Sequence, residues 1–228
     1  MRGWLLSCSL LGLAPPCAAQ TLPAVFDHNR IELVAHGDDG TPLKFVTDSG
    51  GGFNAISQAV ADRLGLVRDG TLDMGKTMLP LVDCPAFLAR SGIPAPLPDP
   101  WLHGKLAVAG PDMPFAADGF LGSHWFAGRA WRIDYGRHEM ALLHGWKPAA
   151  GDRATPLGFQ ANDDGERVAH MPRMTIGVDG KPLDVLLDTG ATFTVTDASA
   201  PAFHVAPGAR VGGGFIMKTV YDDWHARH

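Results

Sequence analysis

Two acidic side chains stand in matching surroundings, in segments far apart in the sequence. Each aspartate ends an apolar run and is followed by a small hydroxyl residue and a glycine: Asp48-Ser49-Gly50 in the first segment and Asp188-Thr189-Gly190 in the second. A carboxyl group in such a turn can donate or accept a proton during a reaction. Two carboxyl groups held side by side cannot both ionise easily, so they share one proton. Together they are suited to general acid–base chemistry.

The segment DSGG (48–51) also permits a different chemistry, with Ser49 as a nucleophile. A nucleophilic serine needs a histidine base and an acid that orients the histidine. In chymotrypsin-like serine proteases both come well before the serine, whereas only His28 and His36 are available upstream of Ser49. His36 falls at a predicted hairpin turn, where we expect a surface role. The sequence therefore assigns the chemistry to Asp48.

The elements that must position these aspartates form an internal repeat. Residues 30–53 have alternating apolar residues, a DDG turn and a second apolar run ending at Asp48. Residues 173–197 repeat this plan, with a VDGK turn and a run that ends at Asp188. An Asp-Gly pair between two such runs is typical of a β-hairpin. The repeat predicts two related lobes, each contributing one aspartate.

A third segment adds to this pattern. The three segments together are FVTDSGGG (45–52), DGFLGSHWFAGRAWRIDYGRHEMAL (118–142) and VLLDTGAT (185–192). They resemble the aspartic proteases of the pepsin and retropepsin type, especially the bacterial exported retropepsin-like proteins. Phe120, Leu121 and Gly122 are similar to the second signature of that family, a strand packed across the catalytic turn. The resemblance implies an all-β, bilobal acid-protease fold of the pepsin/retropepsin-like kind.

The resemblance also implies a role for each site residue. Asp48 and Asp188 would form the catalytic dyad and hold the water that attacks a peptide carbonyl. The supporting residues would be two hydroxyl side chains that hold the turns together and two glycines that let the backbone approach the carboxyl groups: Ser49, Thr189, Gly50 and Gly190. This chemistry uses no cofactor and no metal, and the histidines have no zinc-binding spacing such as HExxH.

These patterns divide the chain into a signal peptide (1–19), a first retropepsin-like lobe (22–147) and a second lobe (155–228). No second apolar-apolar-glycine signature follows Asp188, so we expect the second lobe to be incomplete, as in a truncated chain. A flap that covers the substrate is expected in the first lobe. The candidate residues for its tip are Met74, Met78 and Trp101.

The leading hypothesis is an aspartic endopeptidase that hydrolyses peptide bonds in a peptide or protein substrate. Two alternatives stay open at this point. One is a non-catalytic peptide-binding protein that keeps the fold. The other is a homodimeric enzyme in which Asp48 of each chain forms the dyad, an arrangement that an incomplete second lobe would favour.

Composition and the N-terminal sequence indicate the kinds of partner and the location of the protein. The formal net charge is -5 and the basic residues form no cluster, which argues against a nucleic-acid partner. Arg2, the apolar run after it and the small residues up to Ala19 are typical of a secretory signal peptide, so we expect a periplasmic or secreted protein. No other segment is apolar enough to span a bilayer, which predicts no integral membrane segment after signal cleavage.

Overall fold

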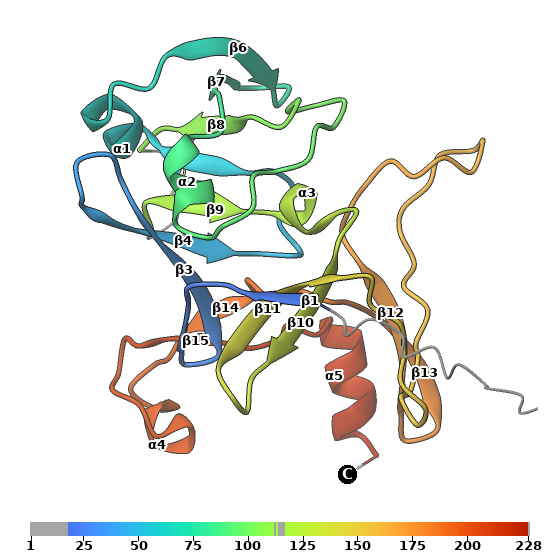
Figure 1. Ribbon diagram of the computed structural model, residues 1–228. Helices are drawn as coiled ribbons and strands as arrows, with labels where there is room; N and C mark the ends of the chain where they lie inside the picture. Colours follow the sequence, from blue (N-terminus) through green and yellow to red (C-terminus); the bar gives the residue numbers. More distant parts are fainter. Residues whose placement is uncertain (1–17, 112, 114–116, 228) are drawn as a thin grey trace, which may run out of the picture.

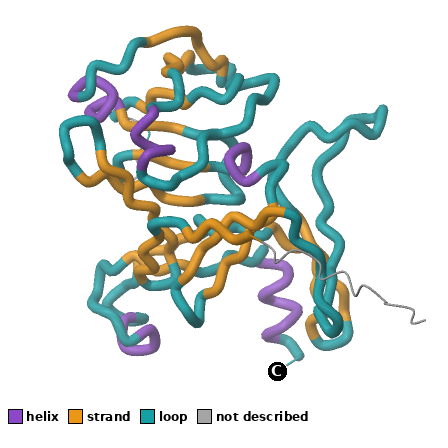
Figure 2. Tube along the Cα trace, viewed as in Figure 1, coloured by secondary structure: helices purple, strands orange, loops and turns teal. Residues whose placement is uncertain are grey.

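The computed structural model describes residues 18–111, 113 and 117–227 (Figure 1). Most of the predicted signal peptide, residues 1–17, lies outside the described residues. The structure is predominantly β, with 36% of the described residues in strands and 13% in helices. Figure 2 shows strands in both the upper and the lower part of the molecule, with a few short helices between and beside them. The all-β class is therefore confirmed at this level.

The largest sheet has eight strands in the order β2-β3-β4-β9-β5-β8-β7-β6. Their bounds are β2 Ala24–Asp27, β3 Arg30–His36, β4 Pro42–Thr47, β5 Ala55–Ser57, β6 Arg68–Asp73, β7 Met78–Val82, β8 Leu106–Ala109 and β9 Gly119–Leu121. The first predicted hairpin forms as β3 and β4, which pair antiparallel with Leu33 opposite Phe45. Both side chains are fully buried, as expected where apolar residues alternate along one face.

A second, three-stranded sheet has the order β1-β11-β10. It is formed by β1 Ala18–Thr21, β10 Ala130–Asp134 and β11 Glu139–His144, and three short helices accompany the two sheets: α1 Gln58–Arg63, α2 Ala86–Arg90 and α3 Ser123–Phe126. The main hydrophobic core extends from Leu22 to Leu142, and a second buried cluster includes Leu72 of β6 and Leu79 and Leu81 of β7. The largest fully buried side chains of the main core include Phe45, Phe87 and Trp125. Burial of this much apolar surface is the main stabilising contribution to this part of the chain.

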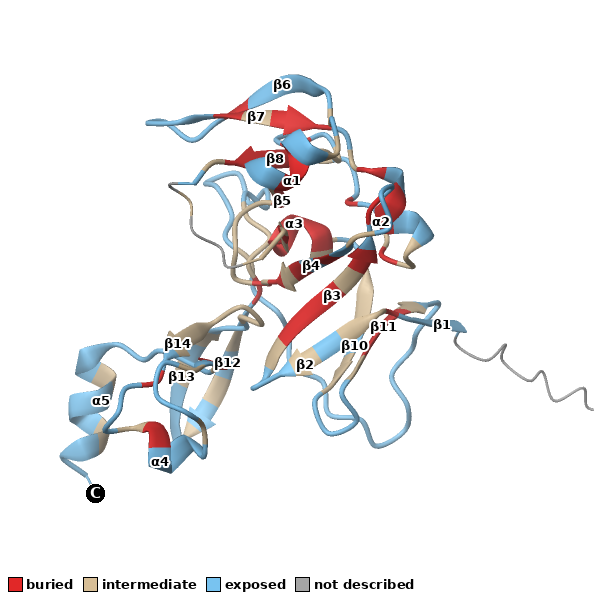
Figure 3. Ribbon diagram, turned by 90° about the vertical axis from the view of Figure 1, so that its left-hand side faces the viewer, coloured by how far each residue is buried: buried red, intermediate tan, exposed pale blue. Residues whose placement is uncertain are grey.

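The C-terminal part of the chain has fewer buried residues than the first part. It contains β12 Arg173–Val178, β13 Lys181–Leu186, β14 Thr192–Thr194, α4 Ala200–Phe203, β15 Arg210–Gly212 and α5 Lys218–His225. The second predicted hairpin forms as β12 and β13, and β14 pairs with β15. Its buried cluster consists of Val195, Ala200 and Val211. Figure 3 shows that buried residues are concentrated in the first part of the chain and are few in this one.

One loop of the first part fixes the position of the C-terminal part. His28 and Asn29, between β2 and β3, both have positive φ angles. The Gly212 amide in β15 donates a hydrogen bond of 2.7 Å to the His28 carbonyl. A Cβ at Gly212 would lie 2.6 Å from the Asn29 carbonyl oxygen, so no larger residue fits between the two segments. This contact brings β14 and β15 against the end of the β2–β3 hairpin.

Strand β9 is inserted between β4 and β5, and this insertion creates the turn that carries Asp48. β9 pairs parallel with β4 and antiparallel with β5. The chain from Asp48 to Asn54 must therefore cross over the end of β9. Gly122 lies directly beneath the crossing: its amide donates to the Asn54 Oδ1 atom at 2.9 Å, and an added Cβ would lie 2.3 Å from the Phe53 carbonyl oxygen.

Among the described residues, none of the helices combines the length and the apolar character needed to cross a bilayer.

We predict that Gly122→Ala destabilises the protein by about 2 kcal/mol or more, because the new methyl group meets a backbone carbonyl that cannot rotate away. Gly177→Ala is the matched control, since a Cβ at that position in β12 has open space around it. Thermal and denaturant unfolding of the two variants provide the measurement. Equal stability of both variants would show that the crossing over β9 is not tightly packed.

Candidate active site

The structure brings the two predicted turns into direct contact. The Ser49 amide donates to the Thr189 Oγ1 atom at 3.1 Å, and the Thr189 amide donates to the Ser49 Oγ atom at 3.0 Å. The Ser49 hydroxyl in turn donates to the Leu187 carbonyl at 2.6 Å. Ser49 is only 4% exposed, so these bonds form away from bulk water. The same two residue positions thus exchange hydrogen bonds across the repeat, and the two turns are held as one unit.

The glycines of the two turns allow the carboxyl groups to approach. A Cβ at Gly50 would lie 2.5 Å from the Cγ atom of Asp188, and a Cβ at Gly190 would lie 2.3 Å from the Cγ atom of Asp48. Each carboxyl group therefore occupies the space that a side chain on the opposite glycine would fill. Any other residue at these two positions would displace a carboxyl group.

Burial raises the pKa of Asp48 to about 7, and the hydrogen bond to Asp188 and the charge of Asp188 add to the shift. The backbone amides of Gly51 and Gly50 act in the opposite direction and only partly offset it. One oxygen of this carboxyl group, Oδ1, is buried without a hydrogen-bond partner among the described residues. Asp48 is therefore a carboxyl group that keeps its proton near neutral pH and has an unsatisfied oxygen.

The three residues of the predicted signature, Phe120, Leu121 and Gly122, lie against the first turn. The Asp48 amide donates to the Leu121 carbonyl at 2.9 Å. A Cβ at Gly51 would lie 2.4 Å from the Cζ atom of the Phe120 ring. From the sequence, Gly51 and Gly52 suggest an unusually flexible first turn. The contact with Phe120 gives a packing reason for glycine at position 51, because the ring occupies the space of its side chain.

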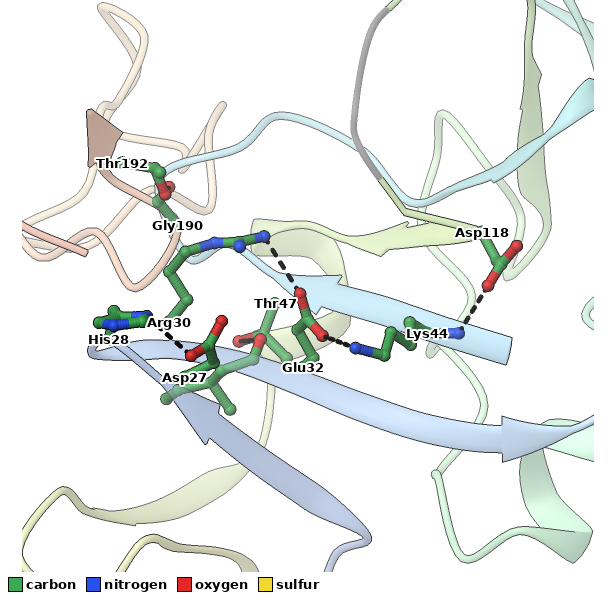
Figure 4. Close-up of polar contacts among 10 residues, drawn as sticks. Asp27, His28, Arg30, Glu32, Lys44, Thr47, Asp118, Gly190 and Thr192 are labelled. Atoms are coloured by element: carbon green, nitrogen blue, oxygen red, sulfur yellow. Dashed lines mark hydrogen bonds and ion pairs between the residues drawn. The ribbon is translucent and has the colours of Figure 1, made fainter. Parts of the chain in front are cut away.

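An ion network around the buried Glu32 carboxylate lies on β3 and β4 (Figure 4). The Glu32 carboxylate pairs with Arg30 at 3.2 Å and with Lys44 at 3.0 Å, and it is only 5% exposed. The Lys44 amide donates to the Asp118 Oδ2 atom at 2.9 Å, which connects β4 to the residue before β9. Removing one cation would leave a buried charge partly uncompensated. The network therefore helps to hold β4 and β9 in the register that positions Asp48.

A hairpin lies in the interval where a flap is expected. β6 and β7 pair antiparallel, and the turn between them carries Met74, with Met78 at the start of β7; both side chains are about half exposed. Phe53, in the loop that follows Asp48, packs against the buried cluster of this hairpin. Trp101, the third candidate, lies elsewhere: its ring is 5.8 Å from that of His124 in α3.

A segment of the C-terminal half, residues 157–172, reaches the first part of the chain. Its His170 ring meets the His124 ring edge to face, with centroids 4.7 Å apart. His124 Nδ1 lies 3.4 Å from an Asp99 carboxylate oxygen. Nothing in the sequence suggested this histidine pair, because the two residues are distant in the chain and belong to no recognisable motif. The residues described by the structure contain no group of three or more His, Cys, Asp or Glu side chains arranged to hold a metal ion.

The exchange of hydrogen bonds between the turns predicts energetic coupling. Ser49→Ala and Thr189→Val should each lower the free energy of unfolding by about 1 kcal/mol or more. The double variant should lose less than the sum of the two, with a coupling energy of about 1 kcal/mol. Ser57→Ala, which removes the N-cap of α1, serves as the control and should be additive with Thr189→Val. Additive losses in the Ser49/Thr189 cycle would argue against the interlocked turns.

The pKa of Asp48 predicts a dependence of stability on pH. The folded pKa of about 7 lies above the ordinary value of 3.8, so the stability due to this group is complete at acidic pH and is lost as pH rises through about 7. Asp48→Asn should remove this loss, so its stability relative to the native protein should increase as pH rises from about 4 to about 7. Denaturant unfolding at several pH values measures the difference. Parallel stability profiles of Asp48→Asn and the native protein would refute the prediction.

Comparison with known proteins assigns no family to the chain. No family model matches it, and no curated protein matches its sequence.

Proposed function

We propose that the protein is an aspartic endopeptidase with a bilobal, pepsin/retropepsin-like fold, and that Asp48 and Asp188 are its catalytic dyad. The observation that carries this proposal is the reciprocal contact of the two turns, in which each carboxyl group lies against the glycine of the other turn. A single Asp-Thr-Gly turn is common, because aspartate caps its own backbone and glycine accepts a positive φ. Two such turns that exchange hydrogen bonds hold two carboxyl groups together, which is an arrangement suited to catalysis.

The proposed reaction uses one protonated and one ionised carboxyl group. Asp48, whose pKa is raised to about 7, donates its proton to the carbonyl oxygen of the scissile peptide bond. Asp188 accepts a proton from the attacking water, whose oxygen forms a bond to the carbonyl carbon. The tetrahedral intermediate then collapses: the C–N bond breaks, the nitrogen takes the proton held by Asp188, and the proton given by Asp48 returns to it. The products are a carboxylic acid and an amine, and the dyad is restored.

The substrate in this proposal is an extended peptide or an unstructured protein segment. The β6–β7 hairpin, with its half-exposed Met74 and Met78, is our candidate for the flap that closes over the peptide. Its packing against Phe53 links its position to the turn that carries Asp48. The signal-like N-terminus supports export, so we place the activity in the periplasm or outside the cell.

The contact of Asp48 with Asp188 argues for a dyad formed within one chain. In the homodimeric alternative, Asp48 of a second chain would have to take the space that Asp188 fills beside Gly50. A non-catalytic peptide-binding protein is the other alternative, and it predicts binding without turnover. Cleavage assays of the two aspartate variants distinguish the single-chain dyad, the homodimer and the non-catalytic protein.

We expect the purified protein to cleave an unstructured polypeptide such as reduced, alkylated casein at acidic pH. Asp48→Asn and Asp188→Asn should each lower the rate by about 100-fold or more, because each removes one proton-transfer group. The control, Asp197→Asn, changes an exposed aspartate and should keep the native rate. Mass spectrometry of the products gives the measurement. Binding without cleavage would favour the non-catalytic alternative, and full activity of Asp188→Asn with second-order dependence on protein concentration would favour the homodimer.

The pH dependence of cleavage follows from the same group. Since Asp48 must carry its proton in the free enzyme, kcat/KM should fall as pH rises through about 7. A profile measured from about pH 4 to about pH 9 tests this expectation. An activity that increases steadily above neutral pH would be inconsistent with a protonated Asp48 as the acid.

A further inference from the structure

A cavity of about 810 Å³ lies next to the two turns. Ser49, Leu187, Asp188 and Thr189 are among the described residues that line it, whereas Asp48 is not. Much of the remaining surface is apolar and largely aromatic, provided by Phe126, Trp131, Tyr135, Leu143, Trp146 and Phe159. Its volume is in the range of small-molecule sites, which are mostly apolar with a few polar groups. Trp146 is 50% exposed and Tyr135 is 43% exposed, so these rings have room for a ligand.

Two arginines face this aromatic cavity, and neither has a carboxylate partner among the described residues. The Arg129 guanidinium donates to the carbonyls of Trp125, at 3.1 Å, and Ala95. Arg167 donates from Nε to the Ala169 carbonyl at 2.9 Å, and its guanidinium carbon lies 3.4 Å from the centre of the Phe159 ring. A guanidinium has five N–H donors, so both groups keep donors free.

Burial lowers the pKa of both Arg129 and Arg167. This direction means that the surroundings disfavour the positive charges, which no described carboxylate compensates. Other arginines of the chain have such partners: Arg30 pairs with Glu32, and Arg173 pairs with Asp184. An anion bound in the cavity would offset the unfavourable burial, and a carboxylate matches the planar fork of a guanidinium.

We propose that this cavity binds a molecule that has a carboxylate attached to an apolar body. The carboxylate pairs with Arg129, which is the more deeply buried of the two arginines, and the apolar body packs on the aromatic rings. Arg167, on the 157–172 segment, also lines the cavity and adds positive potential. Two sources have this chemistry: the free C-terminus of a peptide that ends in apolar residues, and a fatty acid.

The proposed site adjoins the proposed dyad, because Asp188 is one of the residues that line the cavity, but binding there depends on the arginines and the aromatic rings and not on catalysis. A ligand here would contact Ser49 and Leu187, which are hydrogen-bonded to each other, and would thereby touch the residues that hold the two turns together. Binding can be measured without turnover, so the two proposals can fail independently.

The test is calorimetric titration of the full chain with two matched pairs of probes. Dodecanoate is compared with dodecanol, and acetyl-Phe-Leu acid is compared with acetyl-Phe-Leu amide. The Asp48→Asn variant is used for the peptides, so that cleavage cannot contribute. We expect at least one acid to bind about tenfold or more tightly than its neutral analogue, because a charge-assisted pair with a guanidinium is lost in the analogue. The pair that shows this preference identifies the source.

Arginine variants locate the contact. Arg129→Gln should weaken binding of the acid about tenfold or more, Arg129→Lys should have an intermediate effect, and Arg167→Gln should have a smaller effect of about two- to fivefold. The control is Arg153→Gln, an exposed arginine that does not line the cavity, and it should bind like the native protein. Thermal unfolding of each variant checks that it is folded, and Arg167→Gln provides the test if Arg129→Gln is not.

Three results would overturn the proposal. They are equal binding of the acids and their neutral analogues, no binding of any probe, and affinity for the acid that is unchanged in both Arg129→Gln and Arg167→Gln. A fourth such result could come from sedimentation velocity of the free protein. A stable dimer that dissociates in the Trp146→Glu variant would show that a second copy of the chain, and not a small ligand, covers the aromatic cavity.

Discussion

The close crossing of two turns is the constraint on which the rest of this structure depends. Ser49 and Thr189 exchange backbone-to-hydroxyl hydrogen bonds, and Gly50 and Gly190 leave the space that the opposite carboxyl groups fill. Neither feature is sufficient alone: the hydrogen bonds hold the turns, and the glycines permit the approach. Two acidic groups held this close in partly buried surroundings cannot both be charged at low cost. Burial is the largest cause of the raised pKa of Asp48, and the hydrogen bond to Asp188 and the charge of Asp188 add to it.

The two turns are supported unequally by the rest of the chain. The first is anchored in a large core through β4 and β9, where Phe45 and Leu121 are fully buried. The second follows a hairpin whose side chains are mostly exposed or half-buried, and its nearest core has three buried residues. The position of the second turn therefore depends on contacts with the first part of the chain, namely the hydrogen bonds of Ser49 and the docking of Gly212 on the β2–β3 loop.

The sequence predicted the strands that deliver the aspartates better than it predicted their surroundings. The hairpins 30–53 and 173–197 follow from alternation and Asp-Gly turns, which are local signals. The apolar-apolar-glycine strand also lies where the resemblance implied, beside the first turn. The contact between Gly51 and Phe120 could not be foreseen, because it depends on how β9 is inserted between β4 and β5. The meeting of His124 and His170 likewise arises from tertiary packing and has no local signal.

The shared environment of the two carboxyl groups can be tested most directly by carbon-detected NMR titration of the Asp48 side chain in the native protein and in Asp188→Asn. We expect the Asp48 carboxyl carbon to titrate with a pKa of about 7 in the native protein, and we expect this pKa to fall when the charge of Asp188 is removed. An Asp48 carboxyl group that titrates near 4 in the folded native protein, and that does not respond to the substitution at position 188, would contradict it.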